Sequence, residues 1–157
     1  MKKVLLIAIC ICLVFLVGCG SGVFTTNGMT ITLTTEFSEK SVSGVTAVYD
    51  SEKIGVLCYK LPFETNPDYQ DMTVGEFAEY YREQKSELNP SDVSVDDGVT
   101  YVEFENKESD GVNYTYCTTF FVANDGVWTI LFFAKSEEYP GLKQTILGYA
   151  RTVRIGE

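Results

Sequence analysis

The sequence predicts an α+β fold in which two main helices pack on a twisted, mainly antiparallel sheet. Between Val99 and Lys135, three apolar segments separated by two polar turns are typical of a three-stranded meander. Two further segments, one before the meander and one after it, have apolar residues at helical spacing. With 157 residues, 45% of them hydrophobic, the chain is long enough for one domain with its own core.

The meander is expected to contain strands at Tyr101–Glu105, Asn113–Ala123 and Val127–Ala134. A polar turn over 106–111 separates the first two. The second turn, Asn124-Asp125-Gly126, is a strong hairpin signal because glycine readily adopts the positive φ that such turns need.

Both faces of the meander are apolar, which a strand with one face in water would not be. In the second strand Phe120 and Val122 point one way, while Cys117 and Phe121 point the other. We therefore expect helices to cover both faces of the sheet.

Before the meander, the alternation in Met29–Thr34 predicts a strand, and the polar residues 36–42 predict a loop. Two more strands are predicted at Val45–Tyr49 and Ile54–Leu61. Pro62 should end the second of these, because proline cannot donate a hydrogen bond to a central strand.

The clearest helix is predicted over Thr73–Leu88. Thr73 and Glu76 match a capping box, in which each side chain bonds the other residue's backbone amide. Asn89-Pro90 should stop the helix. A second helix is predicted at Pro140–Val153, since proline suits a first turn. Ile155 is expected to add a short extended segment after it.

Residues 1–18 have the parts of an export signal: Lys2 and Lys3, then an apolar run of 14 residues, Val4–Val17, too short to span a membrane. The run ends in Leu16-Val17-Gly18-Cys19. This N-terminus resembles a bacterial lipoprotein signal peptide with its lipobox. The resemblance implies cleavage between Gly18 and Cys19 and lipidation of the Cys19 sulfur with diacylglycerol carrying fatty acyl chains such as palmitate. An ordinary secretion signal and an uncleaved anchor are the alternatives.

The expected organisation is a signal peptide at 1–18, a lipidated cysteine and flexible tether at 19–23, and one domain at 24–157. Gly20-Ser21-Gly22 has the composition of a flexible linker. Such a protein would be lipid-anchored to the cell membrane on its extracytoplasmic face, with the domain within about 18 Å of the anchor.

The chain is acidic, with 22 acidic and 12 basic residues. Residues 1–18 contain two lysines and no acid, so their removal leaves a net charge of −12. This charge argues against a nucleic-acid partner and against electrostatic adsorption to anionic lipid. The chain also has no histidine, the commonest general base and metal ligand.

Two cysteines, Cys58 and Cys117, lie inside predicted strands of the domain. Without histidine no Cys–His nucleophile can form, and two thiolates alone would lack the further ligands of a metal site. We expect two buried thiols, because cysteine in an apolar strand packs as a small hydrophobic residue. A disulfide is the alternative, since disulfides persist outside the cytoplasm.

No catalytic or metal-binding set and no cofactor motif is predicted from the sequence. The acidic pairs Asp96-Asp97 and Glu103 with Glu105 lack the spacing of a calcium loop, and we interpret them as part of a solvated face. A pair of carboxylates across a cleft would be needed for glycoside hydrolysis.

Aromatic residues are numerous, with ten Tyr, ten Phe and one Trp. Ordinary core packing is the simplest interpretation. The alternative is a groove for a sugar, peptide or protein partner. The tyrosines considered for it are Tyr59, Tyr69, Tyr80, Tyr81, Tyr101, Tyr114 and Tyr116.

The order of strands, helix, meander and helix over 23–157 resembles the fold of the photosystem II extrinsic protein PsbP and of small DcrB-like bacterial lipoproteins. The resemblance implies a PsbP-like sandwich and a non-enzymatic accessory or binding protein of the bacterial envelope, with an envelope or membrane protein as partner. It transfers no site residue. A sugar- or peptide-binding lipoprotein and an envelope hydrolase with paired carboxylates are the alternative functions.

Overall fold

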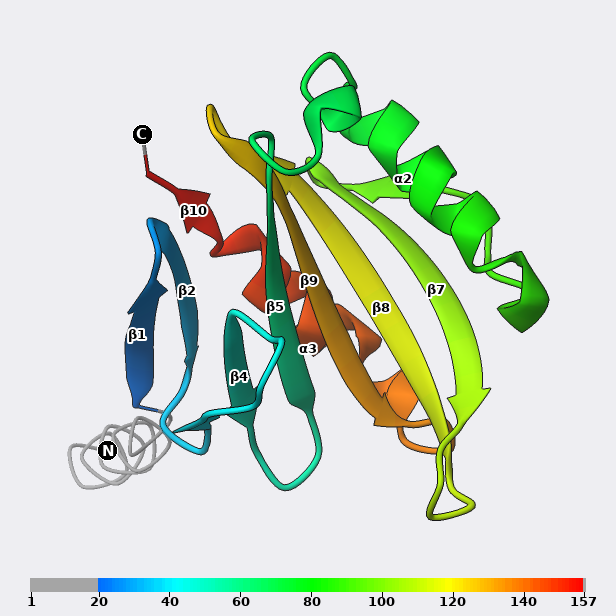
Figure 1. Ribbon diagram of the computed structural model, residues 1–157. Helices are drawn as coiled ribbons and strands as arrows, with labels where there is room; N and C mark the ends of the chain where they lie inside the picture. The colour runs from blue at the N-terminus through cyan, green and yellow to red at the C-terminus, as the bar shows by residue number, and fades with distance from the viewer. Residues whose placement is uncertain (1–19, 157) are drawn as a thin grey trace, which may run out of the picture.

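The computed structural model describes residues 20–156 as two antiparallel sheets with two main helices (Figure 1). The smaller sheet has the order β1-β2-β10 and the larger the order β3-β4-β5-β9-β8-β7-β6. The strands are β1 (Ser21–Thr26), β2 (Met29–Thr34), β3 (Ser38–Lys40), β4 (Ala47–Asp50), β5 (Gly55–Pro62), β6 (Ser94–Asp96), β7 (Val99–Lys107), β8 (Asn113–Val122), β9 (Gly126–Lys135) and β10 (Arg154–Ile155). The predicted α+β fold class is confirmed.

The predicted meander forms strands β7, β8 and β9, each within two residues of its expected bounds. β9 lies at the centre of the larger sheet, between β8 and β5. Because β5 pairs with β9 from Gly55 to Pro62, the N-terminal hairpin β4–β5 extends the meander into one continuous sheet.

Helix α2 (Val74–Gln84) follows a 3₁₀ turn, η1 (Pro67–Tyr69), and begins at the predicted capping box. The Thr73 hydroxyl accepts a hydrogen bond from the Glu76 amide at 3.2 Å, and the Glu76 carboxylate accepts one from the Thr73 amide at 2.9 Å. The helix ends earlier than predicted, since η2 (Ser86–Leu88) is a second 3₁₀ turn. Asn89 then takes a positive φ of 48°, which ends the helical path.

Helix α3 (Tyr139–Arg151) begins one residue before the predicted Pro140 and ends two residues before Val153. It packs on the face of the larger sheet opposite to α2 and also contacts β2, so it joins the two sheets (Figure 1). The core between these elements includes fully buried side chains such as Trp128, Ile146 and Leu147.

A second, smaller hydrophobic cluster lies beneath α2. Phe77 and Ala78 of the helix pack on Val102, Phe120 and Val127 of the sheet. The expectation that helices cover both faces is therefore met on the α3 face, but α2 covers the other face only over part of its width.

The predicted tether needs correction, because Ser21 and Gly22 belong to β1. Ser21 pairs with Thr34 and Gly22 with Leu33, so these residues are held in a sheet instead of forming a flexible linker. The folded domain begins before residue 24. Linker-like composition misled the prediction, since a strand needs only backbone pairing where its side chains are small.

Two short strands were also not predicted. β3 lies within the predicted loop over 36–42, and β6 precedes the meander. Both are edge strands of three residues, which is too short for a side-chain pattern to identify them.

The predicted signal peptide at 1–18, its cleavage site at Gly18 and the lipidated Cys19 lie outside the described residues. Within 20–156, no helix is long and apolar enough to cross a membrane.

Candidate functional site

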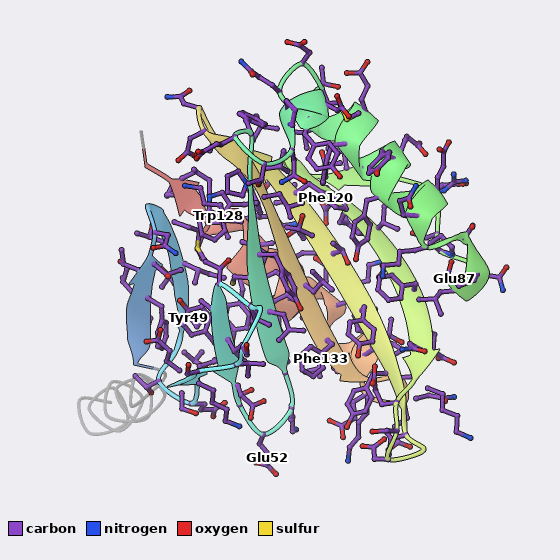
Figure 2. The ribbon with its side chains drawn as sticks, in the orientation of Figure 1. Tyr49, Glu52, Glu87, Phe120, Trp128 and Phe133 are labelled. Carbon is purple, nitrogen blue, oxygen red and sulfur yellow. The ribbon has the colours of Figure 1, made fainter. Side chains whose placement is uncertain are left out.

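Part of the larger sheet is left open on the α2 side. Helix α2 makes its main sheet contacts with β7 and β8, so much of the neighbouring surface of β5 and β9 has no helix above it (Figure 1). The side chains of Leu57, Tyr59, Leu131 and Phe133 on this surface are only partly buried. Phe120 lies beneath α2, whereas Phe133 lies toward the other end of the sheet (Figure 2).

One end of the open surface is an aromatic row across three strands. The rings of Phe104 and Tyr116 stack with centroids 5.0 Å apart, and those of Tyr116 and Phe133 stack at 5.5 Å. Gly55 pairs with Phe133 on the neighbouring strand, and a Cβ atom at Gly55 would lie 2.1 Å from the Phe133 ring. The ring thus occupies the space above the glycine.

The other end is a groove of about 260 Å³ between the sheet and the C-terminal half of α2. We call it the α2 groove. Its lining residues are Tyr59 and Leu61 of β5, Thr129 and Leu131 of β9, and Tyr81 and Lys85 from the end of α2. Cross-strand pairing explains the sheet part, because Tyr59 pairs with Thr129, and Leu61 and Leu131 each lie two residues farther along their own strand on the same face.

The two tyrosines of the α2 groove remain neutral hydrogen-bonding groups at ordinary pH. Burial raises the pKa of Tyr59, with a smaller contribution from Cys58. Burial also raises the pKa of Tyr81, partly offset by the neighbouring Thr118 hydroxyl. Tyr59 raises the pKa of Tyr81 a little further, because the two phenol groups lie near each other.

Two further polar groups belong to the α2 groove. Thr129 is only 3% exposed, and its hydroxyl has no hydrogen-bond partner among the described residues. Lys85 places its ammonium 5.9 Å from the centroid of the Tyr81 ring. Lys85 forms no ion pair within 20–156.

The structure brings together few of the tyrosines considered for an aromatic groove. Tyr59 and Tyr81 line the α2 groove. Tyr69 and Tyr80 pack around Phe77 of α2. The remaining three lie elsewhere: Tyr101 in the core on the α3 side, Tyr114 beside Phe133, and Tyr116 in the aromatic row.

Four groove residues were not predicted from the sequence: Leu61, Lys85, Thr129 and Leu131. No local pattern identifies them, because the groove depends on how closely the end of α2 approaches β5 and β9. The isolated threonine in the otherwise apolar segment Val127–Ala134 is the one signal that the sequence offers.

Cys58 and Cys117 are both free thiols and fully buried in the structure. They lie on β5 and β8, which are separated by β9, so their backbones are about 10 Å apart, beyond the reach of a disulfide. Burial raises the pKa of each thiol to about 12. A thiol with such a pKa is a poor nucleophile at neutral pH.

The acidic pairs are engaged in separate contacts. Glu103 accepts hydrogen bonds from Lys143, at 2.7 Å, and from the Tyr139 hydroxyl. Asp96 pairs with Arg151 at 3.0 Å. Within 20–156, no group of three or more His, Cys, Asp or Glu residues is arranged to hold a metal ion.

No family model matches the sequence, and no curated protein matches it. Among solved structures, the cyanobacterial PsbP (CyanoP) of Synechocystis sp. PCC 6803 aligns with a TM-score of 0.57 and 14% identity, over 88% of this chain and 95% of that one. A protein of Bacteroides thetaiotaomicron VPI-5482 aligns with a TM-score of 0.56 and 10% identity over 89% of this chain. The chain spans 50% of that second protein. The fold is therefore PsbP-like, and at these identities the likeness concerns the fold alone.

Proposed function

We propose that the chain is a membrane-tethered extracytoplasmic lipoprotein that acts as a non-enzymatic accessory or binding protein of the bacterial envelope. The main support for a binding role is the open surface of β5 and β9. Its apolar and aromatic side chains are only partly buried: Leu57, Tyr59, Leu131 and Phe133. Aromatic residues on such surfaces are typical of binding sites.

The anchoring role is supported by the lipobox and by the start of the domain. Ser21 is already paired in β1, two residues after Cys19, so at most about 7 Å of chain lies between the anchor and the sheet. A lipid on Cys19 would hold the binding surface near the membrane and raise the local concentration of an envelope or membrane protein partner.

The anchor is tested by mass spectrometry of the mature N-terminus from a bacterial host. We expect the chain to begin at Cys19 with diacylglycerol on its sulfur. Cys19→Ser should abolish processing, whereas Cys12→Ser, in the same apolar region, should leave it unchanged. An unmodified Cys19, or cleavage at another bond, would contradict the anchor.

The binding surface is tested by site-specific photo-cross-linking in living cells. A photoreactive amino acid at Phe133 should give a discrete product with an envelope or membrane protein. The control position is Val95, which is 69% exposed on edge strand β6. The same products from both positions would argue against a specific surface at β5 and β9.

A small-ligand-binding lipoprotein is the second candidate, and the α2 groove favours it. The hydrolase alternative gains no support from the acidic pairs, because Glu103 and Asp96 are each paired with a basic residue.

A further inference from the structure

The α2 groove contains a polar group that the protein itself leaves unsatisfied. Thr129 lies almost fully buried in the floor of the groove, yet its hydroxyl has no partner among the described residues. A buried hydroxyl without a hydrogen bond is destabilising, and valine would fill the same space without that cost. The hydroxyl is therefore in place to bond a group that enters the groove.

The charge at the groove favours an anion. Lys85 lies beside the Tyr81 ring with no ion pair in residues 20–156. None of the six lining residues is acidic, although the chain has 22 acidic residues. A carboxylate on a ligand would give this ammonium the counter-charge that the protein does not supply.

The shape and lining favour a small aromatic body. Tyr59 and Tyr81 present two aromatic rings, while Leu61 and Leu131 supply aliphatic surface. The volume of about 260 Å³ is below the roughly 300–1,000 Å³ typical of sites for drug-sized ligands. A sugar would place several hydroxyl groups against the two leucines, where they would lack partners.

We propose that the α2 groove binds a small aromatic carboxylate, with its ring between Tyr59 and Tyr81, its carboxylate at Lys85 and one hydrogen bond to Thr129. This inference deepens the second candidate function and rests on it. Anchoring through Cys19 does not depend on it.

The test is ligand-observed saturation-transfer NMR on the full chain in phosphatidylcholine nanodiscs, with empty nanodiscs as blank. Three probes separate the features of the ligand. Phenylacetate has the aromatic ring and the charge, phenylacetamide has the ring without the charge, and glucuronate has the charge on a sugar ring. We expect saturation of phenylacetate with a Kd of about 1 mM, as suits about ten non-hydrogen atoms, and weaker binding of the other two.

Variants then locate the site. Lys85→Gln should weaken phenylacetate binding about fivefold, and Thr129→Val about threefold. The matched controls are Lys107→Gln, at the exposed end of β7, and Thr34→Val, whose hydroxyl in β2 is also buried without a partner. Neither control should change binding. Thr129→Val should leave the unfolding midpoint unchanged or raised, which shows that lost binding does not reflect lost structure.

Each other outcome overturns the inference. Equal binding of phenylacetamide removes the role of Lys85, and preferential binding of glucuronate shows a small-ligand site of a different class. Binding that survives both Lys85→Gln and Thr129→Val places the ligand elsewhere. If none of the three probes binds, the inference fails.

Discussion

Gly55→Ala should destabilise the protein, because the Phe133 ring of the neighbouring strand β9 fills the space beside Gly55. An added Cβ atom at Gly55 would lie 2.1 Å from Cζ and 2.4 Å from Cε1 of Phe133. Both distances are shorter than carbon atoms tolerate, so the ring must move. Phe133 also stacks on Tyr116, whose ring stacks in turn on Phe104, and any displacement therefore disturbs the whole aromatic row.

The magnitude follows from overpacking, which costs about 1–3 kcal/mol when a methyl group is forced into a filled space. We expect Gly55→Ala to lower the free energy of unfolding by about 2 kcal/mol. In a Phe133→Ala background the space is empty, and the same change should be neutral or stabilising by about 0.5 kcal/mol, since alanine restricts the unfolded chain more than glycine. The coupling energy between the two positions should thus be about 2 kcal/mol.

Urea unfolding followed by the fluorescence of Trp128, the chain's single tryptophan, measures these energies. Gly75→Ala in α2 is the matched control. Nothing lies within 4 Å of the position that an added Cβ atom would take at Gly75, and the change should stabilise the helix by up to about 1 kcal/mol. If Gly55→Ala lowers the free energy of unfolding as much in the Phe133→Ala background as in the wild type, then the Phe133 ring is not the reason that alanine is unfavourable at this position.

The remaining predictions concern the two buried cysteines, the cap of α2 and the ion pair between Glu103 and Lys143. Mature protein denatured without reductant should show two reactive thiols, Cys58 and Cys117, and a bridged pair would show none. Burial raises the pKa of Cys58 and of Cys117 from 9.0 to about 12, so in the unfolded chain these thiols ionise at lower pH than in the folded protein. The free energy of unfolding should therefore fall as pH rises above 9. It should fall less in a variant with both cysteines replaced by alanine. Thr73→Ala should cost about 1 kcal/mol through loss of the capping box, whereas Thr73→Ser should preserve it, as chemical denaturation would show. A double-mutant cycle on Glu103 and Lys143 should give a coupling of about 1 kcal/mol that falls with added salt, because the pair is partly exposed.

The fold was predictable where side-chain pattern and turn chemistry agree. The meander has long apolar strands, and Asn124-Asp125-Gly126 fixes its last hairpin. The start of α2 was predictable because Thr73 and Glu76 carry the cap in their own side chains. These signals are local, so a single sequence contains them.

The start of β1 was not predictable, because Ser21 and Gly22 have the composition of a linker. Their strand state comes from backbone pairing with β2, whereas Phe24 further along β1 packs on Tyr49. The incomplete cover of the sheet was missed for a related reason. Apolar residues on both faces of a strand indicate burial, but they do not specify how far a helix of 11 residues extends across seven strands.

The site was the least predictable feature, because it joins residues from three elements. Tyr59 and Tyr81 were considered with five other tyrosines, and the pattern gave no means of choosing between them. Whether Tyr59 and Tyr81 line the same groove depends on the position of α2 over the sheet. Lys85 gains its significance because it forms no ion pair within 20–156, which is a property of the folded surface.

The buried threonines of the described sheet give an independent reason to look at the α2 side. Thr119 faces α3, and its hydroxyl donates a hydrogen bond to the Ile130 carbonyl at 3.2 Å. Thr118 and Thr129 face the α2 side, and neither hydroxyl makes a well-formed hydrogen bond within 20–156, although Thr118 lies near the Tyr81 phenol. Each such hydroxyl costs about 1–3 kcal/mol relative to a satisfied or apolar group. Residues that lower stability in this way, such as a buried threonine whose hydroxyl has no partner, tend to occur at functional sites. Of the three buried threonines of the larger sheet, the two whose hydroxyls lack a partner within 20–156 therefore both lie at or beside the α2 groove.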